Sequence, residues 1–479
     1  MPSLPSLFLL ALALAPVSTA VASGAETPAT LSGLSKAEIH SAIACTSDPT
    51  QTFELYLPTA FSPDRRWPLL LVFDPRSRGK ASAELFQEAA ERYGWMIASS
   101  NNTMSDGPVE PNERAFNAMF PDLLRRLPVD RRRIYAAGFS GGAILAWVVG
   151  LQTGQLAGVI SVGGRPPDGM ETLPPRFALW AAAGVADFNH EPTRELDAAA
   201  ERAGVAHRLE FFPGPHSWFD RAGAGRALRW MEILAMRDGR RERDPALIDA
   251  AFADELSAAE SLWAAHEPLD AAHRFGEIAG TFQGLRDVAD LERRAQEILE
   301  SPEARAARGE IAKAKEYEAR GRRRISLTLG LIRSAATLPG LPQLRDSLGL
   351  EGLLSDAQGT GPVAEAAQRV RASALAQFGF YLTQERFDAG DLATAAVALS
   401  LAVEIQPHSS EAWYNFACAL ARTGSKRDAI HALSRALDEG ISLPSQIATD
   451  SDLSSLRGRP DFAALVERAR ARALVPEPR

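Results

Sequence analysis

Residues 133–147 read RIYAAGFSGGAILAW and place one serine, Ser140, between glycines where an apolar strand pattern gives way to an apolar helix pattern. A chain that only had to turn there would favour Gly, Asn or Asp at the central position. In open α/β folds, ligands bind at the carboxyl ends of the strands. The stretch therefore predicts an α/β sheet that presents a serine side chain at its ligand-binding edge.

Short apolar runs alternate with helical patterns from about Thr30 to Met236. Runs such as WPLLLVFD (67–74) are continuous and apolar, which is typical of strands buried on both faces. Strands that alternate with helices need crossovers, so they favour a mostly parallel sheet with helices on both faces. The predicted fold class is α/β, in a domain over 30–237. The predicted strands lie at 52–58, 67–74, 95–101, 133–139, 156–164, 177–184 and 206–214.

The composition of the 479-residue chain excludes several classes of protein. With 46% hydrophobic and 23% charged residues, the chain is globular rather than disordered. A formal charge of −8 argues against a nucleic-acid-binding protein, which needs a basic surface. The sequence contains neither the nucleotide-binding motifs nor HExxH, so no cofactor and no metal are predicted. The two cysteines, Cys45 and Cys418, fall in separate predicted domains and are expected to be free.

Residues 1–22 are predicted to be a signal peptide. Leu7 to Val17 form an apolar core too short to span a bilayer, and Ala20-Val21-Ala22 fits a cleavage site. The segment before this core lacks Lys and Arg, and a buried first helix is the alternative. No later apolar stretch is long enough to span a membrane. We therefore expect an exported protein, periplasmic or secreted, whose mature chain has no membrane span.

The second half of the chain is predicted to be all-α. A charged run at 238–245 has the composition of a linker, and Ala, Leu, Glu and Arg then recur at helical spacing. Residues 246–375 are a helical region that holds either degenerate repeats or a plain helical bundle. Residues 376–479 contain a repeat at an offset of 34 residues, in which Gly390 corresponds to Gly424 and Ala395 to Ala429.

This last part resembles tetratricopeptide repeats. Trp413 and Gly424 stand at the aromatic and turn positions of that family, and Pro407 ends the earlier repeat. The resemblance implies stacked helix pairs with a concave surface for a peptide or protein partner.

Three residues in chain order fit a serine nucleophile with its base and its orienting acid. Gly138 to Gly142 match G-x-S-x-G with a strand before and a helix after, as the motif requires. Asp187 follows the strand at 177–184, and His216 follows the strand at 206–214. The order Ser, Asp, His is the one expected for α/β-hydrolases, so Ser140, Asp187 and His216 are the predicted catalytic residues.

These segments resemble α/β-hydrolase-fold serine esterases, and among them the polyhydroxybutyrate-depolymerase and feruloyl-esterase-like group. VDRRRIYAAGFSGGA, the loop with Asp187 and GPHSWF look like that group's elbow, acid loop and histidine loop. The likeness covers roughly residues 50–235 and implies ester hydrolysis through an acyl-enzyme on Ser140.

The stretch after the third strand departs from that group. Where many relatives have His-Gly, this chain has Asp74-Pro75, and proline has no N–H to donate. The predicted oxyanion donors are therefore the N–H groups of Gly141 and Arg76, although DPRSRG also fits a simple turn. The predicted substrate contacts are Asn101, Asn102 and Trp218.

The sequence also allows other roles for Asp187 and other functions for the predicted α/β domain. Asp187 is also a candidate helix cap, with His190 and Asp197 close by in the sequence. The domain is alternatively an inactive platform for a partner-binding repeat domain, or a serine peptidase of the same fold. In the esterase reading, the substrate is a small-molecule or polymeric ester.

Overall fold

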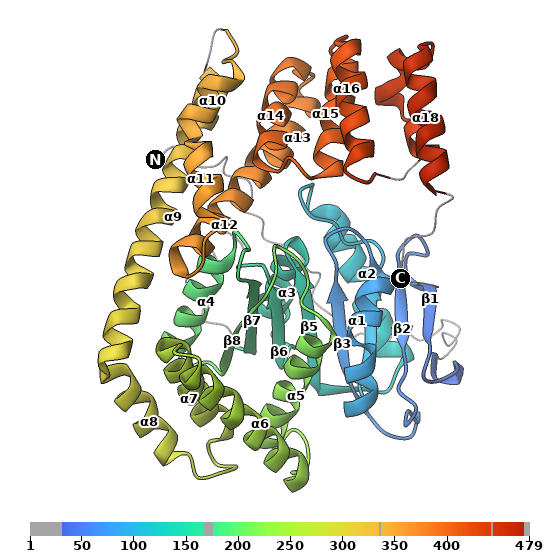
Figure 1. Ribbon diagram of the computed structural model, residues 1–479. Coiled ribbons are helices and arrows are strands. Elements are labelled where there is room, and N and C mark those ends of the chain that lie inside the picture. The colour runs from blue at the N-terminus through green and yellow to red at the C-terminus, as the bar shows by residue number, and fades with distance from the viewer. Residues whose placement is uncertain (1–30, 167–175, 335–336, 442–443, 474–479) are drawn as a thin grey trace. The chain divides into compact units, whose positions relative to one another are not determined.

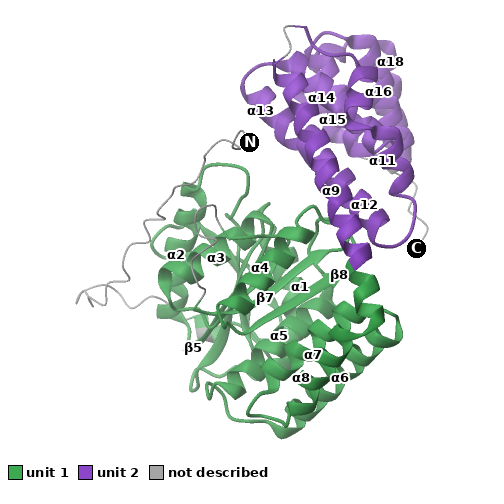
Figure 2. Cartoon of the chain, turned by 90° about the vertical axis from the view of Figure 1, so that its left-hand side faces the viewer, with its two compact units in different colours: residues 1–308 green, residues 309–479 purple. Residues whose placement is uncertain are grey.

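The computed structural model describes residues 31–166, 176–334, 337–441 and 444–473. It divides into two compact units, Met1–Arg308 and Gly309–Arg479 (Figure 2). The predicted signal peptide, 1–22, lies outside the described residues. Within the described ranges, no helix combines the length and the apolar content needed to cross a bilayer.

The first unit contains an eight-stranded sheet in the order β1-β2-β4-β3-β5-β6-β7-β8 (Figure 1). Only the pairs β1–β2 and β2–β4 are antiparallel; the other neighbours run parallel. Seven strands lie where the sequence predicts them. The eighth, β1, was not predicted because its exposed edge position leaves it without an apolar run. The strands are β1 (Ile39–Ala44), β2 (Thr52–Tyr56), β3 (Trp67–Phe73), β4 (Met96–Ser100), β5 (Val129–Phe139), β6 (Gly158–Val162), β7 (Ala178–Gly184) and β8 (His207–Phe212).

Helices cover both faces of this sheet, as predicted. Successive side chains of a strand point to opposite faces, so Leu70 and Val72 of β3 join one core while Leu69 and Leu71 join the other. The helices α1 (Gly79–Tyr93) and α5 (Arg221–Arg237) pack into the core that contains Leu70. The helices on the other face are α2 (Glu110–Arg126), α3 (Gly141–Thr153) and α4 (His190–Arg202). The α/β fold class is confirmed.

Three further helices belong to the first unit: α6 (Pro245–Ala264), α7 (Pro268–Phe282) and α8 (Ala289–Glu300). They share a core with Ile233 and Met236 of α5, and the Trp230 indole N–H donates to Thr281 Oγ1 across 3.0 Å. The predicted linker at 238–245 is the short connection into α6, where the Arg241 guanidinium donates to Glu232. The unit therefore continues beyond 245, and the boundaries drawn from the sequence remain predictions.

The second unit is helical throughout its described part. A π-helical turn at Ala376–Tyr381 joins α12 (Pro362–Leu375) to α13 (Leu382–Asp388). Its helices are α9 (Pro302–Ser334, which begins in the first unit), α10 (Leu341–Leu348), α11 (Leu350–Asp356), α12 (Pro362–Leu375), α13 (Leu382–Asp388), α14 (Leu392–Ile405), α15 (Ser410–Arg422), α16 (Lys426–Asp438), α17 (Pro444–Thr449) and α18 (Pro460–Ala473).

The residues paired by the 34-residue offset occupy matching places in two consecutive helix pairs. Gly390 lies between α13 and α14 with φ 74°, and Gly424 lies between α15 and α16 with φ 83°. Ala395 and Ala429, on the second helix of each pair, are both fully buried. A glycine relieves the left-handed turn, and a small buried residue lets helices approach closely. Assignment to the tetratricopeptide family stays a prediction.

Both cysteines are buried and unbridged. Burial raises the pKa of the Cys45 thiol and of the Cys418 thiol to about 12. Both side chains are therefore neutral at physiological pH and behave as small apolar residues.

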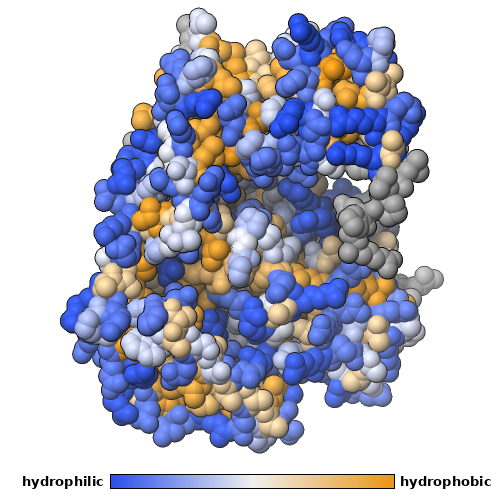
Figure 3. Space-filling model, in the orientation of Figure 1, coloured by the Kyte–Doolittle hydropathy of each residue, from blue (hydrophilic) through white to orange (hydrophobic). Residues whose placement is uncertain are grey.

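On the face shown in Figure 3, hydrophilic side chains dominate and apolar patches are scattered among them.

Candidate active site

Ser140 occupies the turn between β5 and α3 with φ 52° and ψ −120°, a backbone conformation that non-glycine residues rarely adopt. The turn is tight on both sides. A Cβ on Gly138 would lie 2.1 Å from the carbonyl oxygen of Gly142, and one on Gly142 would lie 2.0 Å from that of Phe73. Glycine is therefore required at both positions, and the strained turn holds the serine at the carboxyl end of β5.

Ser140, His216 and Asp187 form one continuous chain of contacts. The Ser140 Oγ lies 3.0 Å from His216 Nε2, and His216 Nδ1 lies 2.9 Å from both carboxylate oxygens of Asp187. Because a carboxylate only accepts hydrogen bonds, Nδ1 carries the ring hydrogen. In the neutral ring Nε2 is then unprotonated and accepts from the serine hydroxyl.

The imidazole of His216 is held between two aromatic rings. Its centroid lies 4.6 Å from that of Phe139 and 4.4 Å from that of Phe188. Asp187 is fully buried, and its Oδ1 also accepts the backbone N–H of Asn189 at 2.8 Å. The ring and the carboxylate are therefore oriented before any substrate binds, which favours proton transfer in one geometry.

Gly163 makes a close approach that the sequence reading missed. It follows β6 with φ 56°, and a Cβ there would lie 2.9 Å from Asp187 Oδ2 and 3.1 Å from His216 Nδ1. Its carbonyl accepts the Asn189 side-chain amide at 2.7 Å. The sequence alone does not reveal this approach, because it depends on β6 lying between β5 and β7, where the end of β6 faces the residues that follow those strands.

The two predicted oxyanion donors differ in their surroundings. Gly141 is the first residue of α3, so its N–H has no partner within the helix and points out of the helix N-terminus. The N–H of Arg76 donates to Asp74 Oδ1 at 2.9 Å. A role for Arg76 in binding an oxyanion stays a prediction, and this hydrogen bond competes with it.

Asp74 anchors several segments beside the site. Its buried carboxylate accepts two hydrogen bonds from the Arg78 guanidinium, each 2.9 Å long, and one from the Trp218 indole N–H at 3.0 Å. Burial raises the pKa of Asp74, but the hydrogen bonds from Arg78, Trp218 and the Arg76 N–H outweigh it and leave the pKa below its usual value. The indole N–H of Trp218 is therefore occupied by Asp74, and the contact of Trp218 with a substrate stays a prediction.

Asn101 and Asn102 line a cavity of about 380 Å³ in the first unit, and both amides are already engaged. Asn101 Nδ2 donates to Glu54 Oε1 at 2.8 Å, and Asn102 Oδ1 accepts the Thr52 backbone N–H at 2.8 Å. Their contact with a substrate stays a prediction. The cavity is lined by Gln51, Ser77, Asn101, Asn102, Met104, Glu110, Pro111 and Arg114.

The other acid and base candidates near Asp187 in the sequence lie elsewhere. His190 stacks on Phe211 at a centroid distance of 3.9 Å. Asp197 and His207 lie close to each other, with His207 Nε2 3.8 Å from Asp197 Oδ1. Of the predicted candidates, the structure brings Asp187 and His216 to Ser140.

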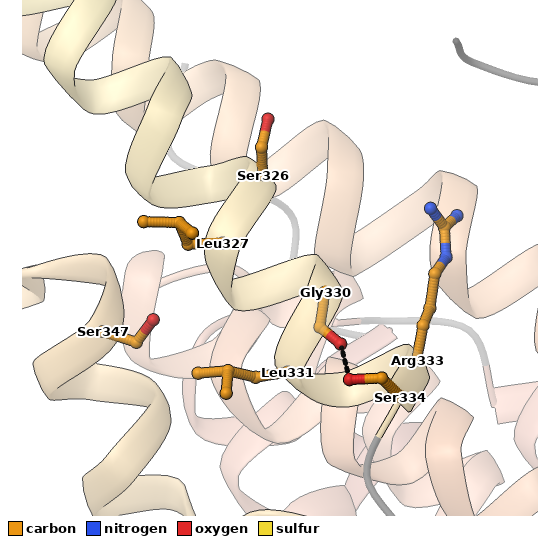
Figure 4. A pocket seen from close by; sticks show the side chains of 7 residues that line it. All are labelled: Ser326, Leu327, Gly330, Leu331, Arg333, Ser334 and Ser347. Carbon is orange, nitrogen blue, oxygen red and sulfur yellow. Dashed lines mark hydrogen bonds between the residues drawn. The ribbon is translucent and has the colours of Figure 1, made fainter. Parts of the chain in front are cut away.

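A second cavity, of about 660 Å³, lies on α9 and α10 of the second unit (Figure 4). The Ser334 hydroxyl donates to the Gly330 carbonyl at 2.7 Å on one side of this cavity. No histidine is among the described residues that line this cavity. It is lined by Ser326, Leu327, Gly330, Leu331, Arg333, Ser334 and Ser347.

No protein-family model matches the sequence, and no curated protein matches it. Among solved structures, a ferulic acid esterase is 16% identical over 40% of this chain and 97% of its own length, with a TM-score of 0.34. A fluorophosphonate-binding serine hydrolase of Staphylococcus aureus, FphF, is 14% identical over 38% of this chain and 92% of its own, with a TM-score of 0.33. Dipeptidyl peptidase 4 of Porphyromonas gingivalis is 17% identical over 41% of this chain and 35% of its own, with a TM-score of 0.33. Likeness at this level assigns neither a reaction nor a substrate to this chain.

Proposed function

We propose that the first unit is a serine hydrolase that cleaves carboxylic esters through an acyl-enzyme. The observation that carries the proposal is the contact of Ser140 Oγ with His216 Nε2 at 3.0 Å, backed by Asp187 at 2.9 Å from Nδ1. A serine hydroxyl is a weak nucleophile on its own and needs such a base. The preference for esters over amides rests on the sequence resemblance.

In the proposed reaction, His216 Nε2 takes the proton of Ser140 as Oγ attacks the ester carbonyl carbon. The carbonyl oxygen becomes an oxyanion, which the Gly141 N–H stabilises at the N-terminus of α3. The oxyanion collapses, and the alcohol leaves with the proton from His216. Water then attacks the acyl-serine while His216 takes a proton from it, and His216 returns that proton to Ser140 Oγ as the carboxylic acid is released. Asp187 keeps the imidazole oriented and stabilises its charged form.

Two further parts of the proposal concern the rest of the chain. Export follows from the predicted signal peptide at 1–22, and binding of a protein or peptide partner follows from the repeat pattern at 376–479. The repeats position the hydrolase on its partner or substrate in this proposal.

The test is labelling of the purified full chain with a fluorophosphonate probe. We expect wild type to be labelled and Ser140→Ala and His216→Ala to be unlabelled, with p-nitrophenyl ester hydrolysis lost in parallel. His190→Ala is the matched control and should label like wild type, because His190 stacks on Phe211 instead of contacting Ser140. A folded wild type that neither labels nor hydrolyses esters would leave the helical unit as the carrier of function.

A further inference from the structure

A second cluster of ionisable side chains lies on three elements of the first unit. Asp197 comes from α4, His207 from β8, and His273 and Glu277 from successive turns of α7. His273 Nε2 lies 3.3 Å from Asp197 Oδ2 and 3.3 Å from Glu277 Oε1. The proposed ester hydrolysis uses none of these four residues, and no sequence motif joins them, since they meet only in the fold.

The cluster leaves buried polar atoms without hydrogen bonds. Asp197 is 3% exposed, yet within the described part of the chain its Oδ1 has no hydrogen-bond partner. His273 Nε2 faces the space between the two carboxylates and lies 3.3 Å from an oxygen of each, which is longer than an ordinary N–H···O hydrogen bond. Buried acceptors are nearly always satisfied, so an unsatisfied carboxylate oxygen beside a ring nitrogen points to an additional ligand.

The separations of these atoms fit a small metal ion. Zinc binds histidine nitrogen and carboxylate oxygen at about 2.0–2.1 Å, which places tetrahedral ligand atoms roughly 3.3–3.4 Å apart. The two contacts of His273 Nε2 are both 3.3 Å, and the ligand atoms of Asp197, His273 and Glu277 all lie within 4.8 Å of one another. Imidazole together with carboxylate is a donor set that suits zinc.

The imidazole of His207 is oriented so that its Nε2 could act as a further metal ligand. Its Nδ1 lies 2.8 Å from the carbonyl oxygen of Val205, and a carbonyl only accepts, so Nδ1 carries the ring hydrogen. The unprotonated Nε2 of the neutral ring then lies 3.8 Å from Asp197 Oδ1. A backbone carbonyl on the far ring nitrogen is the usual way of orienting a metal-binding histidine.

We propose that Asp197, His273 and Glu277 bind one zinc ion, and that His207 or a water completes its tetrahedral coordination. The site is structural: it ties α4 and β8 to α7. It is independent of the proposed esterase, and either proposal can fail without the other.

The contacts of Glu277 are those expected of a zinc-binding carboxylate. They also indicate that a proton on His273 would compete with zinc. Glu277 is held by the Leu209 N–H at 2.5 Å and by Arg208 and Arg274 at 3.3 Å, as a ligating carboxylate usually is. The competing occupant is a proton on His273. Burial lowers the pKa of His273, but the carboxylates of Glu277 and Asp197 outweigh it and raise the pKa to about 9. About a third of the His273 side chain is exposed, which gives an ion access to the site.

The experiment measures metal binding by the full chain. Protein stripped with EDTA is dialysed against buffered Zn²⁺, and bound zinc and the Tm are measured; Co²⁺ is then substituted for its visible spectrum. We expect about one equivalent of zinc, a rise in Tm on zinc addition, and a Co²⁺ spectrum of nitrogen and oxygen ligands. Asp197→Asn and His273→Gln should each weaken zinc binding at least about tenfold.

Cys418→Ser is the matched control, since Cys418, Asp450 and Asp452 of the second unit form another group with metal-ligand spacing. This variant should bind zinc like wild type, and a thiolate band in the Co²⁺ spectrum would overturn the assignment. Failure of folded wild type to bind zinc would also overturn it. If the cluster variants do not fold, the wild-type stoichiometry and Co²⁺ spectrum still decide between these outcomes.

Discussion

The backbone N–H of Arg76 donates to the Oδ1 of Asp74, two residues before it, at 2.9 Å. The same carboxylate also binds the Arg78 guanidinium and the Trp218 indole, so a buried acid gathers the loop after β3 and the loop after His216. Asp74 therefore anchors two of the loops beside the candidate active site.

Asp74→Asn is expected to lower the free energy of unfolding by about 1–3 kcal/mol at pH 7, because the substitution leaves the Arg78 and Trp218 donors with a weaker acceptor. Urea unfolding followed by Trp fluorescence measures the change. Asp64→Asn is the control, since Asp64 is exposed and its carboxylate accepts a hydrogen bond from the nearby Ser62 hydroxyl. Equal stabilities of the two variants would show that the anchor contributes nothing.

The contribution of Asp74 is also expected to depend on pH. Its pKa in the folded protein lies below that of the unfolded chain, so the folded state binds the proton more weakly. The stabilisation is therefore complete above the unfolded-state pKa of about 3.9 and is lost as the pH falls through the lower folded-state value. The difference in unfolding free energy between wild type and Asp74→Asn should be constant from pH 7 to about pH 5 and shrink in stronger acid. A difference that grows in acid would contradict the assigned direction.

Asp187→Asn should lower kcat/KM for a p-nitrophenyl ester by roughly 10⁴-fold, because an amide can donate to Nδ1 and stabilise the wrong ring tautomer. The fold should survive, since the shape of the side chain is unchanged. Steady-state kinetics and the Tm separate the two effects. Asp130→Asn, which alters an ion pair with Arg133 remote in the sheet, should keep full activity. Activity retained in Asp187→Asn would remove Asp187 from the proposed mechanism.

Gly163→Ala should lower activity roughly 10²-fold, since the new Cβ displaces Asp187 or His216 from the reactive geometry. Gly154→Ala is a matched control, because Gly154 also has a positive φ, 61°, but a Cβ there has nothing within 4 Å. Both variants should lose about 1–2 kcal/mol of stability to backbone strain. Only Gly163→Ala should lose activity, and comparable activities in the two would refute the steric argument.

A chain that ends after Arg237 should be much less stable than one that ends after Arg308. Truncation at 237 removes α6 to α8 and exposes Ile233 and Met236, which are each 1% exposed in the intact unit. Exposed apolar surface favours aggregation. Soluble yield and calorimetric Tm of the two fragments provide the comparison, and equal stability would support the sequence-based boundary at 237.

The sequence predicts the sheet and the meeting of Ser140, Asp187 and His216, because buried strands are apolar runs and each candidate follows such a run. It does not predict what depends on neighbours across the sheet. Gly163 looks like an ordinary strand end until β6 is placed between β5 and β7. Asp74 looks like a turn residue until Trp218, 144 positions later, donates to it. The linker at 238–245 stays a prediction, and its charge pattern alone does not reveal that Arg241 pairs with Glu232.

The backbone conformation at Ser140 lowers the stability of the fold while it places the serine hydroxyl at the candidate site. A non-glycine residue at φ 52° and ψ −120° costs of order 1–3 kcal/mol, which glycine at that position would largely recover. Mutation and selection for stability alone would therefore drift this site toward glycine. In the proposed function the need for the Ser140 hydroxyl offsets this cost, and without that need glycine would be the more stable residue here.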